Sequence, residues 1–165
     1  MGLIISPITD IRIDNCRHNL SRNFCYLLCG LDAHANHEIG QLEKALGCDL
    51  MVLKQMDLYH YTEDEENAIL EYDAQNHEDR IKIQNRFSIG RVKAYQNIND
   101  LKNTLKELLL KIYQLPSFYE ILVYNEDWIY QYFKEGEFEN DIKNLLDYAA
   151  CTEEKGAKMI TFMIE

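Results

Sequence analysis

The segment from Asn97 to Pro116, NINDLKNTLKELLLKIYQLP, constrains the fold more than any other part of the chain. Four of its apolar residues recur at i, i+4, i+7 and i+11 and form one helical stripe: Leu101, Leu105, Leu108 and Ile112. Pro116 cannot continue a helix and should close it. At 165 residues the chain can bury about two-thirds of its unfolded surface, so we expect folding to require neither a metal nor a disulfide.

Further helices are predicted on both sides of this segment. A helix of about 14 residues should start at a cap on Asp14 or Asn15 and stop at Gly30. Short helices are expected over 37–46, stopped by Gly47, and over 49–56, capped by Asp49. Helices are also expected over 62–73, over 126–133 and from 137 to just before Gly156. These patterns indicate a helix-rich protein.

Three segments are predicted to be strands because they are rich in β-branched and aromatic residues: 3–9 (with Pro7 near its end), 118–124 and 157–165. The segment 80–95 fits either a hairpin turning near Asn85 or the tail of the preceding helix. If 118–124 and the last strand are parallel, their connection should be right-handed. We predict an α+β fold, a helix-rich single domain over 1–165 with a small sheet of about three to five strands including both chain ends.

The charge is unevenly distributed along the chain, whose formal net charge is -11. Between Asp57 and Asp79 there are nine acidic residues and no Lys or Arg, whereas 80–93 carries five basic residues. The two blocks could pair within the protein, or the acidic block could face a basic partner. An acidic total makes general binding to nucleic acid unlikely.

The cysteine count and the absence of targeting signals bear on the compartment. Five cysteines, an odd number, and no recognisable secretory signal favour free thiols in a reducing compartment. No segment approaches the roughly 18 apolar residues of a membrane span. We therefore expect a cytoplasmic protein without membrane contact.

The acidic stretch begins as a helix would. Thr62 and Glu65 fit a capping box, and the acids of the first turn suit the helix dipole. Ala68, Ile69 and Tyr72 should form a modest apolar face. The consecutive carboxylates of 63–66 splay around a helix, so they favour a solvated or protein-binding face over a metal or catalytic site.

No recognisable catalytic or cofactor motif is present, so no catalytic residue and no cofactor are predicted. Cys25, Cys29, His34 and His37 have zinc-ligand chemistry, but the segment between the Cys pair and the His pair is too short for a zinc finger. Core thiols and loop histidines are the preferred interpretation, and no metal site is predicted.

The segment 118–139 combines eight aromatic residues with six acids and one Lys. Roughly half of the aromatics should be core. Tyr130 and Tyr132 cannot share one helical face, so one of them should be exposed. Aromatic side chains beside acids resemble the anchors and steering charges of a protein interface.

Three classes of function remain. We favour a non-catalytic acidic module that docks and neutralises a basic protein, as an immunity protein or antitoxin neutralises a nuclease-like toxin. The predicted contacts are Glu63, Asp64, Glu66, Asp73, Glu126, Asp127, Trp128, Tyr130 and Tyr132. An enzyme with scattered active-site residues would require a concave pocket with paired titratable groups. A regulator of nucleic acid would use the basic residues of 80–93.

Overall fold

The computed structural model describes residues 4–29, 38–56, 61 and 63–164. These residues form a helix-rich α+β fold with a three-stranded sheet, which confirms the predicted fold class and the place of both chain ends in the sheet. The elements are β1 (Ile5–Thr9), α1 (Arg22–Cys29), α2 (Glu38–Leu46), α3 (Met51–Met56), α4 (Glu63–Asp73), α5 (His77–Ala94), β2 (Gln96–Asn97), α6 (Ile98–Gln114), the 3-10 turn η1 (Phe118–Ile121), α7 (Asp127–Lys134), α8 (Glu137–Glu154) and β3 (Met159–Ile164).

The sheet has the order β1-β3-β2, and both pairs are antiparallel. The two strands from the chain ends pair over their whole length, with Ile5 opposite Ile164 and Thr9 opposite Ile160. Pro7 lies on β1, an edge strand, where a missing N–H is tolerated. The short β2, which was not predicted, pairs with Met159 and Ile160 of β3.

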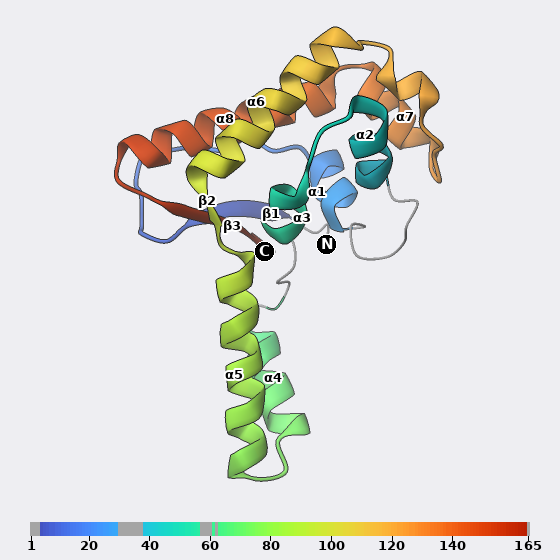
Figure 1. The fold of residues 1–165 in the computed structure, drawn as a ribbon. Coiled ribbons are helices and arrows are strands. Elements are labelled where there is room, and N and C mark those ends of the chain that lie inside the picture. The colour runs from blue at the N-terminus through green and yellow to red at the C-terminus, as the bar shows by residue number, and fades with distance from the viewer. Residues whose placement is uncertain (1–3, 30–37, 57–60, 62, 165) are drawn as a thin grey trace.

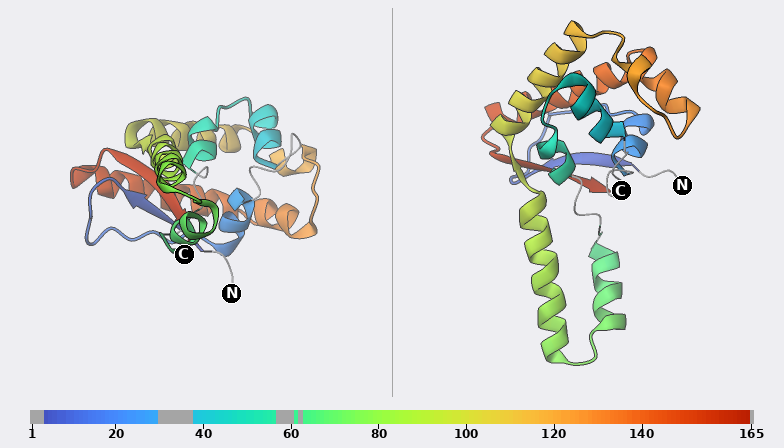
Figure 2. Two further views of the ribbon diagram at one scale, coloured as in Figure 1. Left: turned by 90° about the horizontal axis from the view of Figure 1, so that it is seen from below. Right: turned by 45° about the vertical axis from the view of Figure 1, so that its right-hand side comes forward.

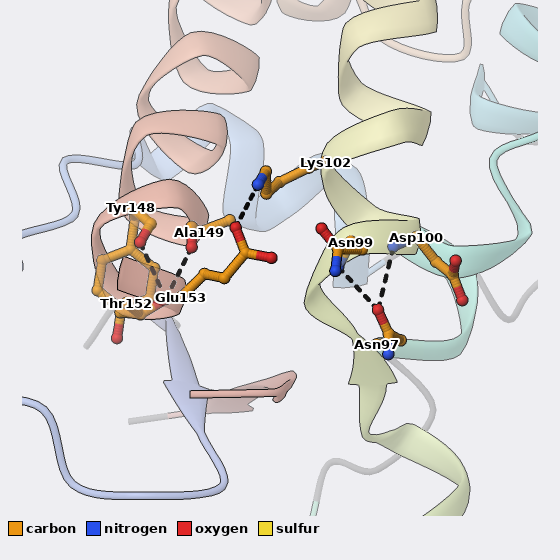
Figure 3. A network of polar contacts seen from close by, with 8 residues as sticks. All are labelled: Asn97, Asn99, Asp100, Lys102, Tyr148, Ala149, Thr152 and Glu153. Atoms are coloured by element: carbon orange, nitrogen blue, oxygen red, sulfur yellow. Dashed lines mark hydrogen bonds and ion pairs between the residues drawn. The ribbon is translucent and has the colours of Figure 1, made fainter. Parts of the chain in front are cut away.

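Helices α6 and α8 pack along each other over the sheet (Figure 1). The predicted stripe of α6 is buried from Leu101 to Ile112. Asn97 caps α6 by accepting hydrogen bonds from the backbone N–H groups of Asn99 and Asp100 (Figure 3). An ion pair between Lys102 and Glu153 joins the two helices.

The first helix starts later than predicted. Neither Asp14 nor Asn15 caps it; α1 begins at Arg22, and the Ser21 hydroxyl accepts a hydrogen bond from the Phe24 N–H at 3.1 Å. Residues 10–20 are held to distant parts of the chain instead. The Asp10 carboxylate, for example, accepts backbone hydrogen bonds from Lys158 and Met159. These long-range contacts outweigh the helical tendency of the segment.

A disulfide between Cys16 and Cys151 fixes the same segment to α8. The prediction that the thiols are free is therefore wrong for these two residues, because spacing in sequence does not reveal a pair separated by 135 residues. Cys25 and Cys48 are buried. Disulfides persist mainly in oxidising compartments, so the cysteine count no longer favours the cytoplasm, and that localisation stays a prediction.

The predicted strand over 118–124 is wrong. Its first residues form η1, and Phe118 packs edge-on against Phe133 of α7, with ring centroids 5.5 Å apart. The Tyr124 hydroxyl donates to the Tyr119 carbonyl at 2.5 Å, which closes the segment on itself. Aromatic packing against α7 thus overrides the β-propensity of these residues. Because 118–124 is not a strand, the right-handed connection between it and the last strand does not arise.

Helices α4 and α5 form a hairpin that projects from the rest of the protein (Figures 1 and 2). We call this hairpin the arm and the rest of the protein the body. Residues 77–94 are one continuous helix, so the alternative of a β-hairpin near Asn85 is wrong. Ile83, Phe87 and Ala94 lie on one helical face and are wholly or partly buried. Residues 81 and 89 fall on another face, so their alternation with Ile83 and Phe87 was not a strand signal.

Candidate protein-binding surfaces

The predicted contact residues do not form one surface. Glu63, Asp64, Glu66 and Asp73 belong to α4 on the arm, whereas 126–132 belongs to α7 and the residue before it. Figures 1 and 2 show α7 on the body, well away from α4. The two halves are therefore separate candidate sites.

On α4, Glu66 does not face solvent. It is 8% exposed, and the Arg91 guanidinium of α5 binds both of its carboxylate oxygens, with Nε donating to Oε1 at 2.9 Å. Leu70, one turn further along, is buried beside it. The basic segment thus folds against the acidic helix at this position, and the geometry makes Glu66 a structural residue of the arm.

The other acids of α4 remain at the surface. Glu63, Asp64, Glu71 and Asp73 are exposed, and their carboxylates form no ion pair with any residue that the structure describes. Glu71 was not among the predicted contacts.

The apolar face of this helix was predicted on Ala68, Ile69 and Tyr72, but Tyr72 is 87% exposed and Ala68 is also exposed. The buried pair Glu66 and Leu70, at i and i+4, defines the inner face instead. Thr62 of the predicted capping box lies outside the described residues.

On the body, Trp128 is the centre of a surface patch. Its indole N–H donates to the Glu126 carboxylate at 2.5 Å, and its ring meets that of Tyr26, with centroids 6.3 Å apart. Glu126 and Asp127 are exposed, and Tyr26 of α1 is 45% exposed. We call Tyr26, Glu126, Asp127 and Trp128 the Trp128 patch. Tyr26 was missed, because nothing in the sequence links it to a residue about 100 positions away.

The loop leading into α7 is held in place beside this patch. The Gln41 side chain of α2 accepts a hydrogen bond from the Val123 N–H at 2.6 Å and donates to the Val123 carbonyl at 2.8 Å. The side chains of Val123 and Ile121 are nevertheless 73% and 62% exposed. This loop therefore presents apolar side chains on a backbone that is already ordered.

The two tyrosines of α7 have different environments. Tyr130 is partly buried, and its ring contacts those of Tyr119 and Tyr124. Tyr132 is 1% exposed and donates to the buried Asp141 carboxylate at 2.6 Å. Tyr132 therefore serves the core, and of the pair Tyr130 and Tyr132 only Tyr130 reaches the surface.

Burial, and then the Asp141 charge, raises the pKa of Tyr132 above its ordinary value. In the unfolded chain Tyr132 ionises near pH 10, whereas in the folded protein it stays protonated. Above that pH the unfolded state binds fewer protons, so we expect the free energy of unfolding to fall by about 1.4 kcal/mol per pH unit from this residue. Urea unfolding of the wild type and of Tyr132→Phe at pH 9 and pH 11 measures this fall. Between the two pH values the free energy of unfolding should fall less for the variant than for the wild type. An equal loss in both proteins would contradict this assignment.

A pocket of about 640 Å³ lies where the arm meets the body. It is lined by residues of both, among them Glu63, Glu66, Arg91, Tyr61 and Tyr95. Burial, and then the Asp10 charge, raises the pKa of Tyr95. This pocket has the concave shape and the paired titratable groups that the enzyme alternative requires. Its paired charged groups, Glu66 and Arg91, bind each other, and this contact fits a structural ion pair that joins α4 to α5.

The possible zinc ligands are only partly described. Cys25 is buried, and its sulfur accepts a hydrogen bond from the Ile5 N–H at 3.3 Å. His34, His37 and the side chain of Cys29 lie outside the described residues. Within the described part of the chain, no three His, Cys, Asp or Glu side chains come together as a metal site would require.

None of the helices that the structure describes is both long and apolar enough to span a membrane. Comparison of the chain with protein-family models, with curated proteins and with solved structures finds no match.

Proposed function

We propose that this protein is a non-catalytic acidic module that docks and neutralises a basic protein partner, as immunity proteins and antitoxins do. The observation that carries the proposal is the Trp128 patch, in which two exposed carboxylates adjoin two aromatic rings that reach the surface. Glu66 and Tyr132, which are buried, are not part of the proposed contact. The exposed acids of α4 lie apart from it on the arm.

The chemistry of the patch suits a protein interface. Trp and Tyr, together with Arg, are enriched among the side chains that contribute most to binding, and steering charges around them favour a partner of opposite charge. The two hydrogen bonds from Gln41 hold the neighbouring loop in place, so little conformational entropy would be lost on binding. Tyr130 is partly buried, and its ring packs against Tyr124 of this loop, so it would help to hold the loop in position.

The charge supports a basic partner. The carboxylates of Glu126 and Asp127 form no ion pair with any described residue. With a net charge of -11, the protein would attract a cationic partner over a distance and repel acidic proteins. Association with such a partner should therefore be fast and should weaken as salt is added.

The first experiment is affinity isolation from the source cells with three tagged proteins. One is the wild type, the second carries Glu126→Gln with Asp127→Asn, and the third is a control with Asp147→Asn and Glu154→Gln on α8. The control removes the same charge from exposed acids outside the patch. We expect one basic protein, identified by mass spectrometry, to be retained by the wild type and the control and to be strongly reduced with the patch variant.

Retention that falls equally with the patch variant and the control would indicate a response to net charge alone and would contradict the assigned surface. The absence of any basic protein from the wild-type sample would contradict the proposed function. Circular dichroism of all three proteins shows whether the substitutions leave the fold intact.

A further inference from the structure

The pocket between the arm and the body, which we call the arm pocket, is partly lined by buried apolar side chains. Four of its lining residues are at most 6% exposed: Leu70, Phe87, Ala94 and Phe162. They belong to α4, α5 and β3, so the pocket is built by the arm and the sheet together. Its volume of about 640 Å³ is in the range of sites that bind small organic molecules, which are mostly apolar with a few polar groups.

Aromatic rings line the arm pocket as well. The Tyr61 ring lies against that of Phe87, with centroids 5.5 Å apart, and Tyr95 follows the end of α5. The face of an aromatic ring attracts a cation, most strongly where water is excluded. The Arg86 guanidinium, which does not line the pocket, already lies 5.6 Å from the centroid of Phe87. The rings of Tyr61 and Tyr95 are therefore the ones that would meet a cationic ligand.

The charges of the arm pocket also favour a cation. Among the described residues that line it, three are charged, and two of these, Glu66 and Arg91, pair with each other. The third is Glu63, an exposed carboxylate that forms no ion pair with any described residue. Burial, and then the Asp10 charge, raises the pKa of Tyr95, so a second negative charge acts on the pocket there. An anionic ligand would have to compete with Glu66 for Arg91.

We propose that the arm pocket binds a small organic cation, namely an amine on an apolar body. The apolar body would pack against the buried side chains and the tyrosine rings, and the ammonium would lie beside the Glu63 carboxylate. The exposed amides of Asn67 and Gln84, which also line the pocket, can donate hydrogen bonds to polar groups of the ligand or accept them. The proposal is independent of the Trp128 patch and of the basic protein that this patch would bind.

Three probes with the same indole body test the charge preference: tryptamine, which is a cation at neutral pH, tryptophol, which is neutral, and indole-3-acetate, which is an anion. Two-dimensional NMR of the isotope-labelled protein follows the side-chain amide of Gln84 in the pocket and, as a control, that of Gln41 beside the Trp128 patch. Tryptamine should shift the Gln84 resonance with a Kd at least about fivefold below that of tryptophol, and indole-3-acetate should bind more weakly than either. The Gln41 resonance should not move.

Two pairs of matched variants locate the site. Glu63→Gln should raise the Kd of tryptamine about threefold and leave that of tryptophol unchanged, whereas Asp64→Asn, at an exposed neighbour that does not line the pocket, should change neither. Asn67→Trp places a large ring in the pocket from an exposed position and should block both probes. Ala68→Trp puts the same ring on the next residue, which is exposed and does not line the pocket, and should block neither.

Four results would overturn the proposal, in proteins that circular dichroism shows to be folded. The first is that no probe shifts the Gln84 resonance, and the second is that indole-3-acetate binds as tightly as tryptamine. The third is an equal effect of the Glu63 and Asp64 substitutions on tryptamine, which would indicate a response to net charge alone. The fourth is a shift of Gln41 in place of Gln84, which would put the cation at the Trp128 patch.

Discussion

Replacing Cys16 and Cys151 by Ser should lower the free energy of unfolding by about 4 kcal/mol and the melting temperature by about 10 °C. The disulfide closes a loop of more than 100 residues, so its loss lets the unfolded chain gain much conformational freedom. It also removes the one covalent link between the segment 10–20 and α8. The contact of the His18 ring with Tyr148 and the hydrogen bond from the Asn144 side chain to the Asn19 carbonyl remain. Thermal unfolding followed by circular dichroism measures the effect.

Dithiothreitol provides the matched control. It should lower the melting temperature of the wild type to that of the double variant and should leave the variant unchanged. If the reductant has no effect on the wild type, or if the variant is as stable as the oxidised protein, the disulfide does not contribute as described.

Asp141→Ala should destabilise the protein by about 4 kcal/mol, the second large effect. The Asp141 carboxylate is 3% exposed and accepts three hydrogen bonds. The donors are the Ser21 N–H at 2.8 Å, the Ser21 hydroxyl at 2.6 Å and the Tyr132 hydroxyl at 2.6 Å. Its loss leaves buried donors without an acceptor and removes the contact that anchors the cap of α1 to α8.

Urea denaturation measures this change in stability. Asp147→Ala, the same substitution at an exposed position of the same helix, should change the stability by no more than about 0.5 kcal/mol. Tyr132→Phe removes only one of the three donors and should be milder than Asp141→Ala. Equal effects at residues 141 and 147 would show that the buried network does not stabilise the fold.

The local patterns in the sequence predict most helices and both terminal strands correctly. The stripe of α6, Gly47 after α2 and the Asp49 side chain, which accepts from the Met51 N–H at 2.8 Å, all act within a few residues. The failures at 14–21 and 118–124 have one cause. The late start of α1 depends on Asp141, 120 positions from Ser21, and η1 depends on packing against α7, so long-range contacts decide both.

The candidate surfaces were only partly predictable for a similar reason. The sequence predicted Glu126, Asp127 and Trp128 together as contact residues because they are neighbours in the chain. Tyr26 joins them only through the packing of α1 on α7. On α4 every acid looks alike in sequence, and only the position of Arg91 on α5 separates the buried Glu66 from the exposed Asp64.

The central claim is that the Trp128 patch binds a basic protein, and isothermal titration calorimetry with the purified partner tests it most directly. The dissociation constant should rise as sodium chloride is added, and this dependence should weaken when Glu126→Gln and Asp127→Asn are introduced together. Trp128→Ala should weaken binding by about 30-fold, whereas Tyr113→Ala on α6 should not. Affinity that is unchanged by both the Trp128 substitution and the two neutralising substitutions, in proteins that remain folded, would contradict the account.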